Sequence, residues 1–217
     1  MLAALAACSR VPEPVPPPVT PGTASPAVPA VVPDARPVLL VFGDSISEGY
    51  GLERGSTFPD VMQRTLDEEK IQWRVVNQGI SGDTTAGGVA RLSSARALRP
   101  SLVLLELGGN DALRGIPLAS TRENLEKMIV EFRGAGAQVV LAGMTLPPNY
   151  GPDYVRGFER IYQDLAAKHK LKLIPFLLAA MVTPDLRYFQ PDGLHPTAEG
   201  AKLVAGTALA AMRPLLR

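Results

Sequence analysis

Three residues in this sequence could together attack an ester. A serine hydroxyl is a weak nucleophile at neutral pH and must give its proton to a nearby base. The chain has only two histidines. His169 lies between two lysines near the end of an expected helix, where a solvated position is the better interpretation, so His195 is the candidate base. Asp192, three residues earlier, could accept a hydrogen bond from its Nδ1–H in a tight turn and fix the imidazole tautomer.

The candidate nucleophile is Ser45, in the segment Gly43-Asp44-Ser45. It follows the apolar run Val38–Phe42, so it should lie where a buried strand opens into a turn. A serine at such a place commonly caps a helix, and Asp192 could equally form an Asx turn beside a structural histidine. Each motif taken alone therefore leaves a structural interpretation open.

Two further segments could stabilise the oxyanion that forms when an ester carbonyl is attacked. Hydrogen-bond donors already aimed at that oxygen are often the largest single contribution to catalysis. Gly82 follows the second expected strand and lacks a Cβ, so its backbone N–H could approach a substrate closely. Asn110 follows the third strand and offers a neutral side-chain donor. Glycine and asparagine are also ordinary turn residues, so neither segment decides the matter alone.

These residues need a scaffold, and the sequence predicts an α/β fold with a parallel sheet. Short apolar runs alternate with longer amphipathic stretches, which is typical of such folds. In an open parallel sheet the ligand crevice lies beyond the carboxyl ends of the strands. We expect strands at Val38–Phe42, Trp73–Asn77, Leu102–Glu106, Val139–Ala142 and Leu171–Ile174, and helices at about Thr57–Lys70, Thr85–Ala97, Thr121–Gly134, Tyr154–His169 and Thr197–Leu215.

Taken together, the segments resemble the four conserved blocks of the SGNH or GDSL hydrolase family, over about residues 38–217. The segment that begins Leu107-Gly108-Gly109-Asn110-Asp111 is most similar to the bacterial arylesterase, acyl-CoA thioesterase and lysophospholipase branch. The resemblance implies a three-layer α/β/α sandwich with a five-stranded parallel sheet, as in flavodoxin. It also implies a triad of Ser45, Asp192 and His195, an oxyanion hole formed by Ser45, Gly82 and Asn110, and no cofactor or metal.

The same resemblance implies a small-molecule substrate: an acyl ester, a thioester or a lysophospholipid. Substrate contacts are expected at Gly108, Leu146, Pro147 and Tyr150. The last three belong to a segment, residues 146–154, that lies beside the acyl pocket in this branch and whose prolines and glycine favour a shaped loop. We expect this segment to tune the preferred acyl length.

Other functions fit the sequence less well. No GxxxxGK[ST] or GxGxxG segment follows an expected strand, no GxSxG elbow surrounds Ser45, and a formal charge of +1 with scattered Lys and Arg disfavours nucleic acid. Three alternatives remain: a carbohydrate O-acetylesterase of the same fold, a non-catalytic envelope binding protein, and a metal-dependent phosphoesterase. The last would use Asp44, Asp83, Asp111, Asp192 and His195 as ligands.

The N-terminal residues predict a location in the bacterial cell envelope. Leu5-Ala6-Ala7-Cys8 resembles a lipobox, which implies that Cys8, the only cysteine, is lipidated. Only seven residues precede it and none is basic, so either the natural start lies upstream or the likeness is accidental. Residues 9–37 are rich in proline and form no core, as in a spacer. We therefore expect a signal remnant at 1–8, a linker at 9–37 and a hydrolase domain at 38–217, in a periplasmic or membrane-anchored lipoprotein.

Overall fold

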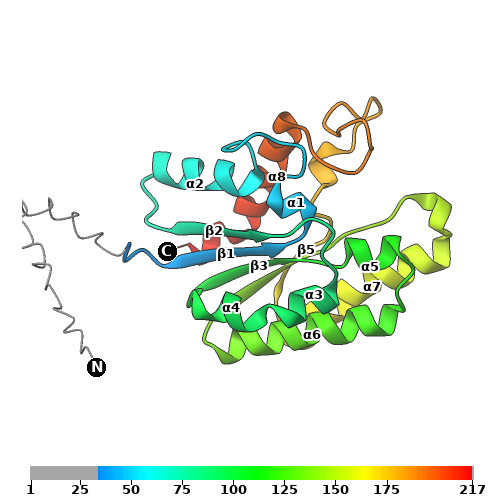
Figure 1. Ribbon diagram of the computed structural model, residues 1–217, viewed down its shortest axis with the longest axis horizontal. Coiled ribbons are helices and arrows are strands. Elements are labelled where there is room, and N and C mark those ends of the chain that lie inside the picture. The colour runs from blue at the N-terminus through cyan, green and yellow to red at the C-terminus, as the bar shows by residue number, and fades with distance from the viewer. Residues whose placement is uncertain (1–33, 217) are drawn as a thin grey trace, which may run out of the picture. The chain divides into compact units, whose positions relative to one another are not determined.

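A five-stranded parallel sheet with the order β2-β1-β3-β4-β5 forms the centre of the fold, as expected (Figure 1). The structure is a computed structural model that describes residues 34–216. The expected lipidation site at Cys8 and the linker up to residue 33 lie outside the described residues. The strands are β1 (Val38–Gly43), β2 (Arg74–Gly79), β3 (Leu102–Glu106), β4 (Gln138–Ala142) and β5 (Lys172–Ile174).

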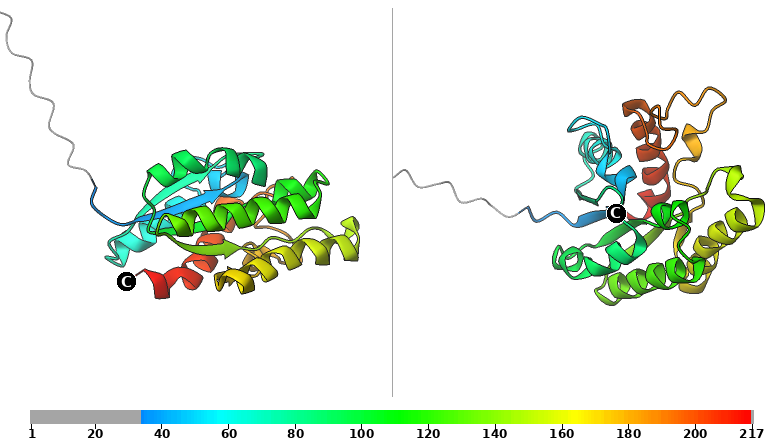
Figure 2. Two further views of the ribbon diagram at one scale, coloured as in Figure 1. Left: turned by 90° about the horizontal axis from the view of Figure 1, so that it is seen from below. Right: turned by 45° about the vertical axis from the view of Figure 1, so that its right-hand side comes forward.

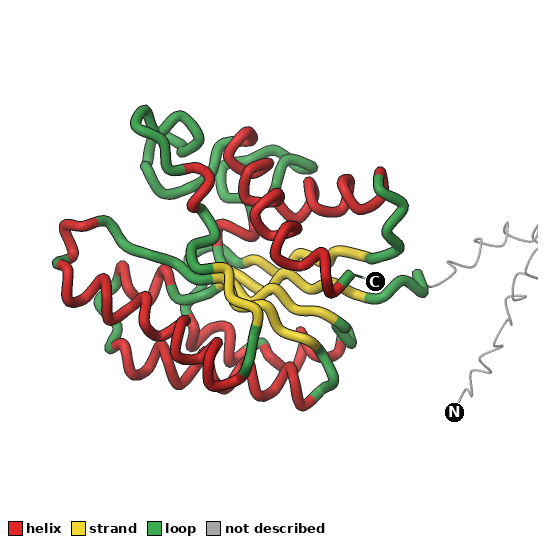
Figure 3. The backbone as a smooth tube through the Cα atoms, turned by 180° about the vertical axis from the view of Figure 1, so that it is seen from behind, coloured by secondary structure: helices red, strands yellow, loops and turns green. Residues whose placement is uncertain are grey.

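Helices cover both faces of the sheet, which gives the expected three layers (Figures 1 and 3). Helices α2 (Phe58–Glu68) and α8 (Ala198–Met212) pack together on one face. The other face carries α6 and α7, which lie side by side (Figure 2). The elements of that face are α3 (Thr85–Ala90), α4 (Leu92–Ala97), α5 (Gly109–Leu113), α6 (Leu118–Gly134) and α7 (Pro152–His169). No helix in the described range is long and apolar enough to cross a bilayer.

The central strands lie wholly inside the protein. Every residue of β1 and β3 is buried, and both read as near-continuous apolar runs, as strands covered on two faces must. Glu106 ends β3 and is the exception, a fully buried carboxyl group. The edge strand β2 is only half-buried.

The helix boundaries follow local capping signals. Thr57 caps α2 in a capping box with Asp60, and Thr197, in the expected cap region, accepts a hydrogen bond from the N–H of Gly200 at the start of α8. The expected single helix at 85–97 is wrong, because the backbone of Arg91 (φ −102°, ψ 10°) leaves the helical region and divides it into α3 and α4. Four short elements were not expected: α1 (Ser45–Glu48), α5, and the 3₁₀ turns Pro148–Tyr150 and Ala179–Met181.

The strand order places the expected site residues at one edge of the sheet. The chain passes from β1 to β2 on one side and then to β3 on the other side of β1, so the order reverses at β1. A ligand crevice is expected outside the carboxyl ends of the strands at such a point. Ser45 follows β1, Gly82 follows β2 and Asn110 follows β3.

Candidate active site

Ser45, His195 and Asp192 form a continuous chain of hydrogen bonds. The distance between Ser45 Oγ and His195 Nε2 is 2.8 Å, and that between His195 Nδ1 and Asp192 Oδ2 is 2.7 Å. An imidazole bonded in this way carries its proton on Nδ1 and leaves Nε2 free to accept the serine proton. The arrangement can therefore generate an alkoxide-like nucleophile.

The loop before α8 holds Asp192 and His195 in one tight turn. The other carboxylate oxygen of Asp192 accepts the backbone N–H groups of Leu194 and His195, at 2.9 and 3.0 Å. Partial burial alone would raise the pKa of Asp192, but the hydrogen bonds from the His195 backbone, the His195 ring and the Leu194 backbone outweigh it and lower the pKa to about 2. The carboxylate is thus charged at neutral pH and can stabilise an imidazolium. The Asx turn and the contact to the histidine, considered as alternatives from the sequence, are both present.

Ser45 occupies the first position of the short helix α1, directly after the buried strand β1. Asp44 caps this helix by accepting the N–H of Ile46, and its other oxygen accepts Nδ2–H of Asn110 at 3.1 Å. Burial raises the pKa of Asp44 to about 6, although hydrogen bonds from Ile46, Glu106 and Asn110 and the nearby His195 counter part of that effect. The fold therefore keeps the Asp44 carboxyl group next to the serine even though burial of its negative charge is unfavourable.

The expected oxyanion donors lie beside this serine. Ser45, Gly82 and Asn110 all line one cavity. Within residues 34–216 the backbone N–H groups of Ser45 and Gly82 have no hydrogen-bond partner, and Asn110 spends one N–H on Asp44. Gly82 has a φ of +76°, a conformation that disfavours any residue with a side chain. The site thus offers up to three unused donors around one hydroxyl.

The cavity has a volume of about 580 Å³ and mostly apolar walls. Leu146 and Pro147 line it, where substrate contacts were expected. Gly108 and Tyr150 do not. Gly108 is buried and has a φ of +119°, and a Cβ at this position would collide with the Tyr162 hydroxyl. The Tyr150 ring stacks on the Tyr154 ring, with the ring centroids 6.5 Å apart. Further apolar walls come from Ile46, Leu113, Met144, Phe176, Leu178, Val182, Leu186, Phe189 and Leu194.

The ligands considered for a metal site do not gather. Asp83 pairs with Arg91 at 2.7 Å, and Asp111 accepts the N–H and the hydroxyl of Thr85 at 2.8 and 2.5 Å. Across residues 34–216, no three His, Cys, Asp or Glu side chains cluster so that they could hold a metal ion. His169 is also away from the site and is not solvated as expected, since only 15% of its side chain is exposed and it pairs with Glu126.

The sequence interpretation missed several residues that support the site. The Tyr50 ring contacts the His195 ring, with centroids 4.6 Å apart. The Gln190 side-chain amide donates to the Tyr50 carbonyl at 2.7 Å, and its backbone N–H donates to the His195 carbonyl at 2.7 Å. Glu106 accepts the Ser47 hydroxyl at 2.6 Å, and burial, followed by the charge of Asp44, raises the pKa of Glu106 well above its usual range. A carboxyl group inside an apolar strand was the one signal available for Glu106.

Known proteins share both the sequence and the fold. The profile of the GDSL-like lipase/acylhydrolase family matches residues 41–203. Esterase TesA of Pseudomonas aeruginosa is 43% identical over 183 residues, which is 84% of this chain and 90% of that protein. Thioesterase 1/protease 1/lysophospholipase L1 of Escherichia coli is 34% identical over 84% of this chain and 86% of its own length. A crystal structure of TesA superimposes with a TM-score of 0.78 at 42% identity, over 82% of this chain and 99% of that chain. This chain belongs to the GDSL-like lipase/acylhydrolase family and is a carboxylic ester hydrolase.

Proposed function

We propose that Ser45 is the nucleophile of a two-step acyl transfer, with His195 as general base and Asp192 as its orienting carboxylate. The hydrogen-bonded chain from Ser45 Oγ through His195 to Asp192 is the observation that carries the proposal. As Ser45 attacks the ester carbonyl, its proton passes to Nε2. His195 then gives that proton to the leaving alcohol or thiol, and an acyl-enzyme remains.

Water completes the cycle by the reverse sequence of proton transfers. His195 Nε2 takes a proton from water as the water oxygen attacks the acyl-enzyme carbonyl. The bond to Ser45 Oγ then breaks, the proton returns to that oxygen, and the carboxylic acid leaves. These steps use only groups of this chain.

The negative charge that develops in both steps needs donors. We assign that role to the backbone N–H groups of Ser45 and Gly82 and to the second side-chain N–H of Asn110, the one that does not bind Asp44. Donors already oriented toward the oxyanion need no rearrangement during the reaction, which makes each worth roughly 10²–10³ in rate.

The cavity supports acyl chains of several carbons rather than acetyl groups alone. Its volume of about 580 Å³ and its walls of Leu, Met, Phe and Pro suit an extended apolar chain. The second candidate, a carbohydrate O-acetylesterase, would be better served by polar side chains near the serine. We therefore favour acyl esters, thioesters or lysophospholipids, with the segment around Leu146 and Pro147 setting the preferred length.

The enzyme's location is a separate proposal. We propose that it works in the bacterial cell envelope, as a periplasmic or membrane-anchored lipoprotein modified at Cys8, with residues 9–37 as spacer and 38–217 as catalytic domain. The lipobox-like sequence and the proline content support this. Mass spectrometry of protein made from its native upstream region should find a diacylglyceryl group on Cys8. An unmodified N-terminus on membrane-free protein would contradict the anchor.

The catalytic proposal is tested by substituting the serine in the full chain. The parent and Ser45→Ala are compared on p-nitrophenyl acetate, butyrate and octanoate, with circular dichroism to confirm that both fold. We expect the variant to lose several orders of magnitude in kcat and to lose labelling by a fluorophosphonate probe, which reacts only with an activated serine. Equal activity in both proteins would mean that Ser45 is not the nucleophile.

A further inference from the structure

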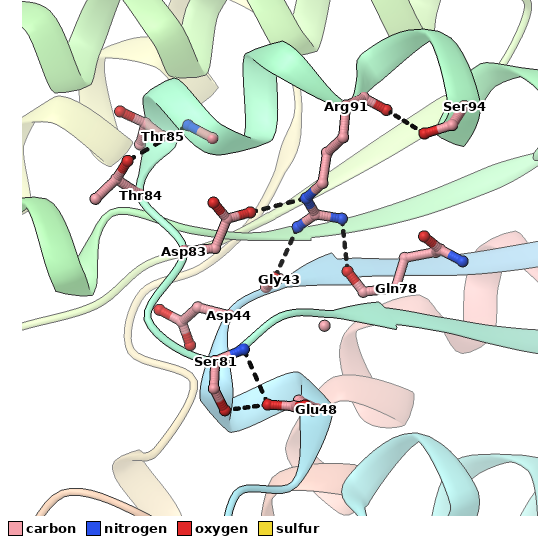
Figure 4. Close-up of polar contacts among 12 residues, drawn as sticks. Gly43, Asp44, Glu48, Gln78, Ser81, Asp83, Thr84, Thr85, Arg91 and Ser94 are labelled. Atoms are coloured by element: carbon pink, nitrogen blue, oxygen red, sulfur yellow. Dashed lines mark hydrogen bonds and ion pairs between the residues drawn. The ribbon is translucent and has the colours of Figure 1, made fainter.

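One guanidinium group joins the ends of two strands below the active site. Arg91 lies at the break between α3 and α4, and only 14% of its side chain is exposed. Its Nε donates to Asp83 Oδ2 at 2.7 Å, its Nη1 to the Gln78 carbonyl at 2.7 Å, and its Nη2 to the Gly43 carbonyl at 2.8 Å (Figure 4). The group also stacks 3.8 Å above the centre of the Phe42 ring.

The three acceptors lie close in sequence to Ser45 and Gly82, whose backbone N–H groups are assigned to the oxyanion. Gly43 ends β1 and lies two residues before Ser45, while Gln78 is the penultimate residue of β2. Asp83 follows Gly82 directly. The pairing of β1 with β2 ends at Gly43 and Gly79, and a last backbone hydrogen bond runs from the Ile80 N–H to the Gly43 carbonyl at 3.2 Å. Beyond that bond the sheet no longer fixes one segment against the other. Arg91 contacts both segments where the sheet stops doing so.

The side-chain contacts of Ser81 and Gly82 face water. Glu48 accepts the backbone N–H of Ser81 at 2.9 Å and the Ser81 hydroxyl, and Arg114 donates to the Gly82 carbonyl at 2.9 Å, but all three contacts are exposed (Figure 4 shows the first two). The side chains of Arg91 and Asp83 are only 14% and 11% exposed. Solvent weakens exposed charge contacts much more than shielded ones, so Arg91 is the firmer constraint.

We propose that Arg91 is a positioning residue that holds the N–H groups of Ser45 and Gly82 at the separation an oxyanion requires. The inference rests on the proposed function, since it concerns the same oxyanion site. A planar guanidinium directs donors to several acceptors in fixed directions, whereas a lysine ammonium is a compact charge on a flexible stem. Lysine at this position keeps the charge and can retain only part of the contacts.

Steady-state kinetics of full-length variants on p-nitrophenyl butyrate test the proposal. Because misplacing a donor costs less than removing one, we expect kcat to fall roughly tenfold in Arg91→Lys and about 100-fold in Arg91→Ala, with KM changed by less than about twofold. Asp83→Asn, which removes the ion pair and leaves Arg91, should resemble Arg91→Lys. Arg96→Ala is the matched control, because Arg96 is an α4 arginine with a 43% exposed side chain that pairs with Glu131. It should keep the parental kcat.

A binding measurement separates positioning from general loss of structure. Phenylboronic acid forms an anionic tetrahedral adduct with a catalytic serine, the serine proton passing to the histidine, whereas octanol only fills an apolar pocket. In Arg91→Lys the inhibition constant of phenylboronic acid should rise by the same factor as kcat falls, and that of octanol should stay unchanged. If Arg91→Ala does not fold, Arg91→Lys and Asp83→Asn carry the test. The inference would be overturned if Arg91→Lys and Asp83→Asn both kept the parental kcat and the parental affinity for phenylboronic acid. It would also be overturned if phenylboronic acid and octanol lost affinity by the same factor. Activity that survives Ser45→Ala would instead refute the proposed function.

Discussion

Asp44→Asn should gain stability relative to the parent protein as the pH rises, and it should be less active. Asp44 is only 3% exposed, and its pKa is raised from 3.8 to about 6. A shift of about 2 pKa units corresponds to about 3 kcal/mol of differential interaction between the charged and neutral forms. The folded state binds the proton of Asp44 more tightly than the unfolded state, so protonation of Asp44 stabilises the fold. That stabilisation is fully present below pH 3.8 and is lost as the pH rises through about 6. Asparagine stays neutral and suffers no such loss.

The substitution has a cost that does not depend on pH. The new amide would keep its oxygen on the Ile46 N–H and turn its NH₂ toward Asn110 Nδ2, so two donors would meet where one hydrogen bond of 3.1 Å now exists. Such a mismatch costs about 1–3 kcal/mol. The difference in unfolding free energy between variant and parent should still rise by about 2 kcal/mol between pH 4.5 and pH 8, because a constant cost cancels in that comparison.

Urea unfolding measures this difference directly. Trp73 is the only tryptophan and is 7% exposed, so its fluorescence should report the loss of tertiary structure. Activity on p-nitrophenyl butyrate at pH 8 should fall by roughly 10²–10³ if Asn110 leaves the oxyanion site. A stability difference that is the same at both pH values would refute the reasoning, because it would mean that folding does not raise the pKa of Asp44.

Substitutions at four residues test other parts of the site. Asn110→Ala should lower kcat by roughly 10²–10³ with little change in KM, since it removes a donor needed mainly in the transition state. Asp192→Asn should lower kcat by about 10⁴, because the amide favours the wrong imidazole tautomer; a variant with the parental kcat would contradict a role for the charged carboxylate, whose pKa is lowered to about 2. Leu146→Trp should reduce the ratio of octanoate to acetate hydrolysis at least roughly tenfold by filling the cavity, while Val130→Trp, on exposed α6 surface, should not. Glu106→Gln should be tolerated, because burial raises the pKa of Glu106 well above its usual range and so favours the neutral form, which the amide resembles, whereas Glu106→Ala should cost about 2 kcal/mol or more in urea unfolding by leaving a cavity and an unpaired Ser47 hydroxyl.

The sheet could be predicted from the sequence because its strands are distinct apolar runs. The segments Val38–Phe42 and Leu102–Glu106 are buried on both faces and are bounded by turn residues, so both were located to within one residue. The helices α1 and α5 were missed because four or five residues are too few to show helical periodicity. Their N-terminal residues give little signal, since Asp44 caps α1 only through the Ile46 N–H and Gly108 starts α5 without a side-chain hydrogen bond.

The walls of the cavity and the buried network beneath it could not be predicted in the same way. Met144, Phe176 and Val182 come from loops, and nothing in their spacing shows that they face Ser45. Arg91 looks like an ordinary charged position on an amphipathic helix, where a solvent-exposed side chain is the normal expectation. Only the folded chain shows that its guanidinium turns inward to two strand ends.

The turn that carries Asp192 and His195 holds two members of the catalytic triad in one rigid unit, separate from Ser45. The base and its carboxylate partner lie three residues apart and share two hydrogen bonds, and a third joins Asp192 to the Leu194 N–H between them, so they move together. Within the triad, the contact between Ser45 and His195 is the one that joins separate elements, 150 residues apart in sequence. The side-chain amide of Gln190 supports the position of this turn by donating to the carbonyls of Tyr50 and Pro196. A substitution at Gln190 would therefore change how firmly the base is held without altering any residue of the triad.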